Sequence, residues 1–173
     1  MIWADVIVAL ILFFSLVGGF TSGVVKSFFS LLIAIIAIPL TGVFYHILTN
    51  VFSFLPGENW DGFVGFFVML IIISIILYII FLLPRKIIEK VWQGGCIFRL
   101  VGGVLGILNS AIGLTLFGLV VLTYPVFGWL ERAVSQSVIL PWLVTHFTFV
   151  AAMLPELFRA PVSQIVSIKT LKI

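Results

Sequence analysis

Residues 63–83 read FVGFFVMLIIISIILYIIFLL, a run without any Asp, Glu, Lys or Arg. A helix rises about 1.5 Å per residue, so about 20 apolar residues cross the hydrocarbon core of a bilayer, which is roughly 30 Å thick. Three further runs, residues 6–25, 28–48 and 101–124, have a similar length and also lack these charged residues. The sequence therefore predicts an all-α integral membrane protein with four transmembrane helices.

The composition of the chain agrees with a lipid environment. Of the 173 residues, 63% are hydrophobic and 9% are charged, whereas a soluble domain has about 45–50% apolar and about 25% charged residues. The formal net charge of +3 is too small for an electrostatic grip on nucleic acid, so membrane lipid is the expected partner. The single cysteine, Cys96, excludes a disulfide framework within the chain and any cysteine-based zinc cluster. No cofactor or metal is expected.

The C-terminal part of the chain is less apolar than the four runs. One helical face of residues 129–136 carries Trp129, Leu130, Ala133 and Val134, and the other carries Glu131, Arg132, Ser135 and Gln136. This pattern is typical of a helix that lies in a membrane interface. We therefore expect a four-helix transmembrane domain over residues 1–126 and a C-terminal interfacial segment and tail over residues 127–173. A fifth crossing by residues 138–158 is the alternative, although this run contains two prolines, a histidine and a glutamate.

The orientation follows from the basic residues, which gather in the cytoplasmic loops of membrane proteins. The turn between the first two runs carries Lys26, and the third connection carries Arg85, Lys86, Lys90 and Arg99. The second connection, residues 47–62, carries acidic residues and no Lys or Arg. We therefore predict that Lys26 and the third connection are cytoplasmic and that the N-terminus lies outside.

The third connection has a helical pattern of its own. Ile87, Ile88, Val91 and Trp92 form an apolar stripe opposite the basic residues Arg85, Lys86 and Lys90. This pattern predicts a short surface helix that begins where Pro84 ends the third span. Its basic residues would face anionic lipid headgroups, at about 1 kcal/mol each. The alternative is that they determine topology and recognise nothing.

Small residues recur every fourth position in two of the runs. The first run contains Ser15, Gly19 and Gly23, and the fourth contains Gly102, Gly106 and Ser110. Such ladders let helix backbones approach closely in lipid, where apolar side chains alone give no preference for protein over lipid. We expect these two helices to contact each other, or copies of themselves in a homo-oligomer.

Several short motifs carry a resemblance to a known family. They are Asp5, the turn Gly23-Val24-Val25-Lys26 followed by Ser30-Leu31, the element RLVGGVLG at 99–106 with Arg99, Gly102 and Gly106, and SVILP at 137–141 with Ser137 and Pro141. Together they resemble the colicin V production protein family, small multi-pass proteins of the bacterial inner membrane. The resemblance implies a membrane accessory role in colicin V production or export and in envelope maintenance, without catalytic residues.

The chain departs from the family pattern at positions near the expected cytoplasmic face. Ser22, Ser27, Phe98 and Asn109 stand where the resemblance leads us to expect charged residues. A charge network that the family forms there would be depleted in this chain.

An enzyme or a transporter would need ionisable groups inside the spans. A serine nucleophile needs a base beside it, and no Lys or His lies in the middle of a span to activate Ser110. Ion transport usually leaves Asp, Glu, Lys or Arg in the spans, and the four runs contain none. We therefore predict a non-enzymatic protein whose ladders around Gly19 and Gly106 assemble it with itself or with another membrane protein. The alternative is an oligomeric channel or transporter subunit.

Overall fold

The computed structural model describes residues 2–52, 59–91 and 95–155. Over these ranges the chain forms α1 (Ile2–Val51), α2 (Trp60–Val91), α3 (Cys96–Thr123), α4 (Gly128–Gln136), α5 (Ile139–His146) and α6 (Thr148–Met153). The first three helices are long and apolar enough to cross a membrane. The prediction of an all-α protein with membrane-spanning helices is confirmed, but these helices number three in the described residues.

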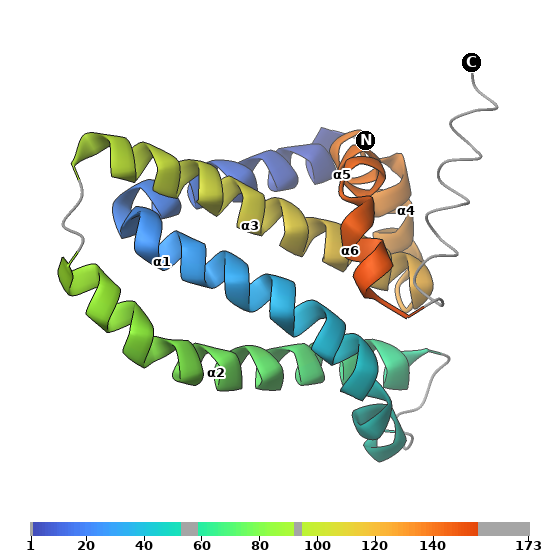
Figure 1. Cartoon of the computed structure of the whole chain (residues 1–173). Coiled ribbons are helices and arrows are strands. Elements are labelled where there is room, and N and C mark those ends of the chain that lie inside the picture. Colours follow the sequence, from blue (N-terminus) through green and yellow to red (C-terminus); the bar gives the residue numbers. More distant parts are fainter. Residues whose placement is uncertain (1, 53–58, 92–94, 156–173) are drawn as a thin grey trace.

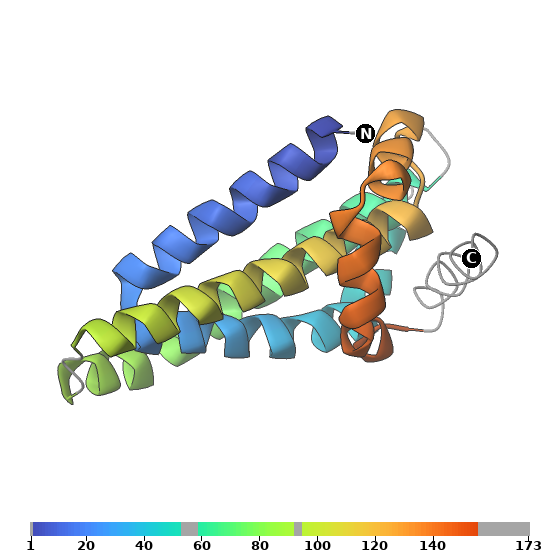
Figure 2. The same ribbon diagram turned by 90° about the horizontal axis from the view of Figure 1, so that it is seen from above.

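The first two predicted spans are two halves of α1. Gly23 has φ 79° and ψ 170°, which is outside the helical region, and the chain reverses its direction along α1 (Figures 1 and 2). At about 1.5 Å per residue, residues 2–22 and 24–51 are about 30 and 42 Å long. The predicted spans put the turn after residue 25, whereas the break lies at Gly23, the first residue of the motif at this turn. The turn depends on a backbone conformation that is essentially confined to glycine.

The long helix α3 lies at the centre of the packing. It contacts both halves of α1 and each of α4, α5 and α6. The helix α2 packs on the second half of α1, where the ring centroids of Phe29 and Phe81 are 5.7 Å apart and those of Tyr45 and Phe66 are 5.9 Å apart. Tyr45, Phe66 and Leu119 are fully buried where these helices meet.

The outer surface of the bundle is apolar. Phe13 and Phe14 on α1 are more than half exposed, and so are Ile79, Ile80 and Leu83 on α2. Soluble monomers rarely expose continuous apolar surface on this scale. The surface therefore suits contact with lipid tails.

The bundle has two distinct ends (Figure 1). At the basic end lie the reversal at Gly23, the end of α2 and the start of α3. At the capped end lie the first turn of α1 and the helices α4, α5 and α6. Asp5 and Arg99 therefore lie at opposite ends, as the sequence indicates.

The helix α2 continues past Pro84 to Val91, so the prediction of a separate surface helix after this proline is wrong. A proline inside a helix removes one backbone hydrogen bond and introduces a bend, but the helix can resume on the other side. Figure 1 shows α2 bending in its C-terminal part. The side chains of Ile87 and Ile88 are exposed there, and Trp92 of the predicted apolar stripe lies outside the described residues.

The C-terminal segment consists of short helices. In α4, Ala133 and Val134 are buried and the polar face is exposed, in agreement with the predicted amphipathic pattern, but Trp129 of the predicted apolar face is 58% exposed. The predicted fifth run contains α5 and α6, which meet at Phe147 and are about 12 and 9 Å long. Neither helix can cross a core of roughly 30 Å. Residues 156–158, the end of that run, lie outside the described part of the chain.

Replacing Gly23 with alanine should lower the free energy of unfolding by about 1–3 kcal/mol, since its φ and ψ are strained for any residue with a Cβ. The control is Gly18→Ala. A Cβ at Gly18 meets no atom within 4 Å, so the change should be neutral or stabilising by up to about 1 kcal/mol. Unfolding by SDS titration from mild-detergent micelles measures both variants. Equal stabilities of the two would contradict the assigned reversal.

Candidate functional site

A single carboxylate joins the two terminal parts of the described chain at the capped end. Oδ1 of Asp5, in the first turn of α1, accepts hydrogen bonds from Oγ of Ser137 at 2.6 Å and from the backbone N–H groups of Val138 at 2.9 Å and Ile139 at 3.1 Å. Asp5 and Ser137 are 132 positions apart in the sequence. Hydrogen bonds to an ionised acceptor are roughly twice as strong as neutral ones. Asp5 therefore fixes the start of α5 to the start of α1.

These contacts explain why the sequence SVILP starts a helix. The first backbone N–H groups of a helix have no partner inside it. Asp5 accepts those of Val138 and Ile139, and the hydroxyl of Ser137 accepts that of Leu140 at 3.1 Å. The next residue is Pro141, which has no N–H group and fits the first turn of a helix. Of the four backbone positions at the start of α5, residues 138–140 thus have an acceptor for their N–H groups, and Pro141 has no N–H group. The carboxylate of Asp5 also places a negative charge at the positive end of the helix dipole.

The helices that follow this contact are part of the main core. Val144 of α5 and Val150 of α6 are at most 1% exposed. They belong to one buried cluster with Ile38 of α1 and with Leu116 and Leu119 of α3. The hydrogen bonds of Asp5 thus position a segment that covers the end of the long helices.

The small-residue ladders lie where the first half of α1 contacts α3. A Cβ built on Gly102 would lie 2.6 Å from the carbonyl oxygen of Gly19, and one built on Gly106 would collide with the carbonyl oxygen of Ser15. The hydroxyl of Ser110 donates a hydrogen bond to that of Ser15. The ladders therefore contact each other within one chain, which is the first of the two alternatives, and this close approach requires residues without a larger side chain.

A polar crevice of about 220 Å³ opens beside the ladders. Its lining includes Ser15, Ser22, Lys26, Ser27, Ser30, Asn109 and Ser110. Nδ2 of Asn109 donates to Oγ of Ser30 at 3.2 Å. Oδ1 of Asn109 is buried and has no hydrogen-bond partner among the described residues. The sequence patterns did not predict this crevice, although Asn109 is the one amide side chain in the span of residues 101–124.

The crevice also collects positions at which the chain departs from the family pattern. Ser22, Ser27 and Asn109, which come from both halves of α1 and from α3, all line it. Phe98 lines a neighbouring cavity of about 220 Å³ together with Arg99, Glu89 and Ser22. The positions at which the resemblance predicts charged residues therefore lie together in one region of the basic end.

The predicted basic residues of the third connection lie in the last turns of α2. Nε of Arg85 donates to Oε1 of Glu89 at 2.8 Å, and Lys86 and Lys90 are exposed. Arg99 is exposed at the start of α3, and Glu89 lines the same cavity. Among the described residues, no three His, Cys, Asp or Glu side chains gather as a metal site would require.

Replacing Asp5 with alanine should destabilise the protein by about 1.5–3 kcal/mol, because the helix start of α5 loses a charged acceptor. Ser137→Ala should cost less, and the double variant should show a coupling energy of about 0.5–3 kcal/mol between the two positions. Ser135→Ala is the control, since this exposed hydroxyl bonds only within its own helix. Detergent unfolding of the wild type, the two single variants and the double variant gives the cycle, and purely additive effects would contradict the contact.

Comparison with known proteins adds the family. The model of the colicin V production protein family matches residues 4–148. Neither the curated proteins nor the solved structures include a significant match to the chain. The matched range covers most of the 173 residues, and it contains Asp5, Ser137 and both ladders. The chain therefore belongs to the colicin V production protein family.

Proposed function

We propose that this protein is a non-catalytic accessory protein of a bacterial inner membrane, acting in the production or export of colicin V and in maintenance of the envelope. The observation that carries the proposal is the family match over residues 4–148, together with helices apolar enough for a membrane. The polar side chains of the motifs are consistent with a structural use. Asp5 bonds Ser137 and the start of α5, and Ser110 bonds Ser15.

The proposed placement has four crossings. Each half of α1 is long enough to span the core by itself, and α2 and α3 supply the other two crossings. The basic end holds Lys26, Arg85 and Arg99 and faces the cytoplasm, as the positive-inside rule predicts. The capped end, with the N-terminus and α4 to α6, then lies outside.

Because the ladders contact each other inside the chain, a partner must bind elsewhere. The apolar outer faces of α1 and α2 are free for this contact in the described structure. The proposed partner is a second membrane protein or a second copy of the chain. An accessory protein of this kind acts by holding its partner in the membrane.

The second candidate function is that of an oligomeric channel or transporter subunit. The polar crevice favours it, because hydroxyl groups, an amide and Lys26 line a space next to apolar spans. Polar groups at membrane depth are expensive and often mark a solute pathway. Association of several copies would have to complete the pore.

The orientation can be tested with the native cysteine. Cys96 is the only cysteine in the chain and is exposed at the start of α3. A membrane-impermeant maleimide should leave it unlabelled in intact spheroplasts and label it in inverted vesicles. In a Cys96→Ser background, the comparison is Asn50→Cys, at an exposed position near the C-terminal end of α1. This cysteine should show the opposite labelling pattern. Labelling of Cys96 in intact spheroplasts would contradict the proposed orientation.

The function can be tested by release of colicin V from a producing strain whose copy of the gene is deleted. The wild-type gene and Gly113→Ile should restore release, since a Cβ at Gly113 meets no atom within 4 Å. Gly106→Ile should restore less than about a tenth, because it collides with the backbone at Ser15. Immunoblots of the membranes show how much of each variant is present.

Purification from native membranes and reconstitution in liposomes separate the two candidate functions. An accessory protein should purify from native membranes with a stoichiometric partner and give no solute flux in liposomes. A self-oligomer that conducts solute in liposomes would favour the channel. Toxin release that is unchanged by the deletion would contradict the role in colicin V production.

A further inference from the structure

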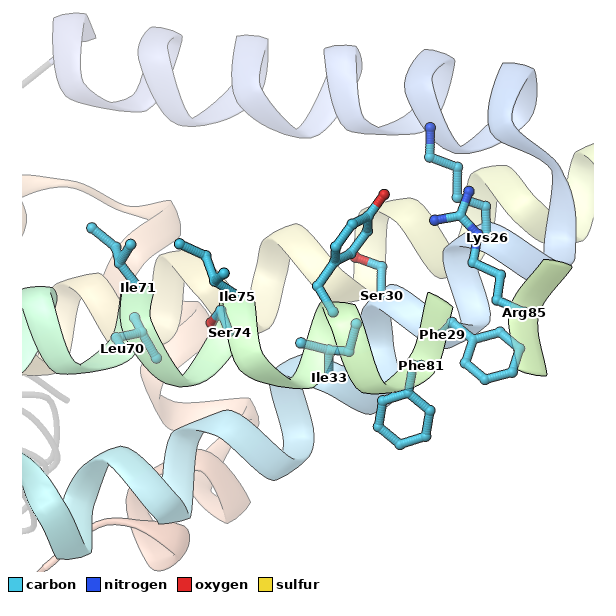
Figure 3. Close-up of a pocket in the computed structure, with 11 residues that line it drawn as sticks. Lys26, Phe29, Ser30, Ile33, Leu70, Ile71, Ser74, Ile75, Phe81 and Arg85 are labelled. Carbon is cyan, nitrogen blue, oxygen red and sulfur yellow. The ribbon is translucent and has the colours of Figure 1, made fainter. Parts of the chain in front are cut away.

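An elongated cavity of about 450 Å³ lies between the second half of α1 and α2 (Figure 3). This volume is within the range of about 300–1,000 Å³ that is typical of small-molecule sites. Its walls are mostly apolar and are built by Phe29, Ile33, Leu70, Ile71, Ile75 and Phe81. It is separate from the contacts of Asp5, which lie at the capped end.

The cavity is charged at one end only. Figure 3 shows Lys26 and Arg85 together at the basic end of the cavity, with Leu70 and Ile71 at the opposite end. Lys26 has no ion pair among the described residues, and Arg85 donates to Glu89 through Nε. The terminal amino groups of its guanidinium are therefore still available as donors. The hydroxyl-bearing residue Ser30 lines the wall one helical turn from Lys26.

The cavity is longer than one half of the hydrocarbon core of a bilayer. Between Leu70 and Arg85 it follows α2 for about 22 Å, which is more than half of a hydrocarbon core of roughly 30 Å. The end of the cavity that carries Lys26 and Arg85 lies at the basic end of the bundle. Lipid headgroups lie at this level if α1 and α2 cross the membrane. An occupant must therefore carry an anionic group at one end and an apolar chain that reaches toward the middle of the membrane.

We propose that this cavity binds one anionic phospholipid, with its phosphate on Lys26 and Arg85 and an acyl chain between α1 and α2. The inference rests on the proposed placement of the helices in the membrane. The two cations complement a net negative headgroup, and a zwitterionic headgroup lacks that net charge. A protein helix in the cavity would leave the cationic end without a counter-ion.

The test uses the full chain reconstituted with equal amounts of phosphatidylglycerol and phosphatidylcholine. After extraction in mild detergent, native mass spectrometry counts the lipids that the protein retains. The wild type should retain one phosphatidylglycerol in preference to phosphatidylcholine. The double variant Lys26→Gln, Arg85→Gln should reduce this preference by about 25-fold, or about fivefold for each cation.

Two matched controls separate a binding site from general attraction. The double variant Lys86→Gln, Lys90→Gln removes the same charge from the same end, outside the cavity lining, and should reduce the preference much less than the change at Lys26 and Arg85 does. Ser74→Phe fills the cavity with both cations in place and should abolish retention. Ile76→Phe, at an exposed position outside the lining, should retain the lipid.

The outcomes also distinguish this inference from the proposed function. Equal losses in the two charge variants would overturn the site, because they would show attraction by the basic end as a whole. Equal retention of both lipids by the wild type would overturn the preference for an anionic headgroup. Failure of the wild-type protein to float with vesicles would instead contradict the membrane placement, and the lipid site with it.

Discussion

The close approach of the first half of α1 to α3 is the contact on which the other contacts depend. Lipid tails are as apolar as leucine side chains, so helices associate in lipid by fitting closely together. Gly19, Gly102 and Gly106 allow the two backbones to meet. The reversal at Gly23 returns the second half of α1 along the same bundle, where Asn109 of α3 bonds Ser30. Both halves of α1 are thereby held against α3.

This contact also places the family motifs relative to one another. With the first half of α1 held along α3, Asp5 lies at the end of the bundle where α3 finishes and α5 begins. Its carboxylate can then serve the N–H groups that follow Ser137. The start of α5 thus explains three of the motif residues together: Asp5, Ser137 and Pro141. Their distance in the sequence hides this relation, since capping is usually provided by a neighbouring residue.

The basic end concentrates the features that can bind another molecule. Lys26 lines both the polar crevice and the apolar cavity, and Ser30 lies beside it in both. Where the family pattern suggests charges, this chain has Ser22, Ser27 and Asn109 in the crevice. Lys26 is therefore left without an ion pair among the described residues. An unpaired cation beside an apolar cavity suits an anionic amphiphile.

Composition and periodicity by themselves determined the all-α class, the apolar spans, the polarity of α4 and the small-residue ladders, because burial in lipid demands continuous apolar runs. They extended the first span to residue 25 and predicted a helix end at Pro84. The break lies instead at Gly23, where the backbone adopts a conformation that charge does not report, and α2 continues through its proline. Only the tertiary structure decided that Asp5 meets Ser137, that the ladders face each other, and that Lys26 and Arg85 share a cavity. These contacts join residues far apart in the chain, and local sequence patterns contain no information about which distant helix face a side chain will meet.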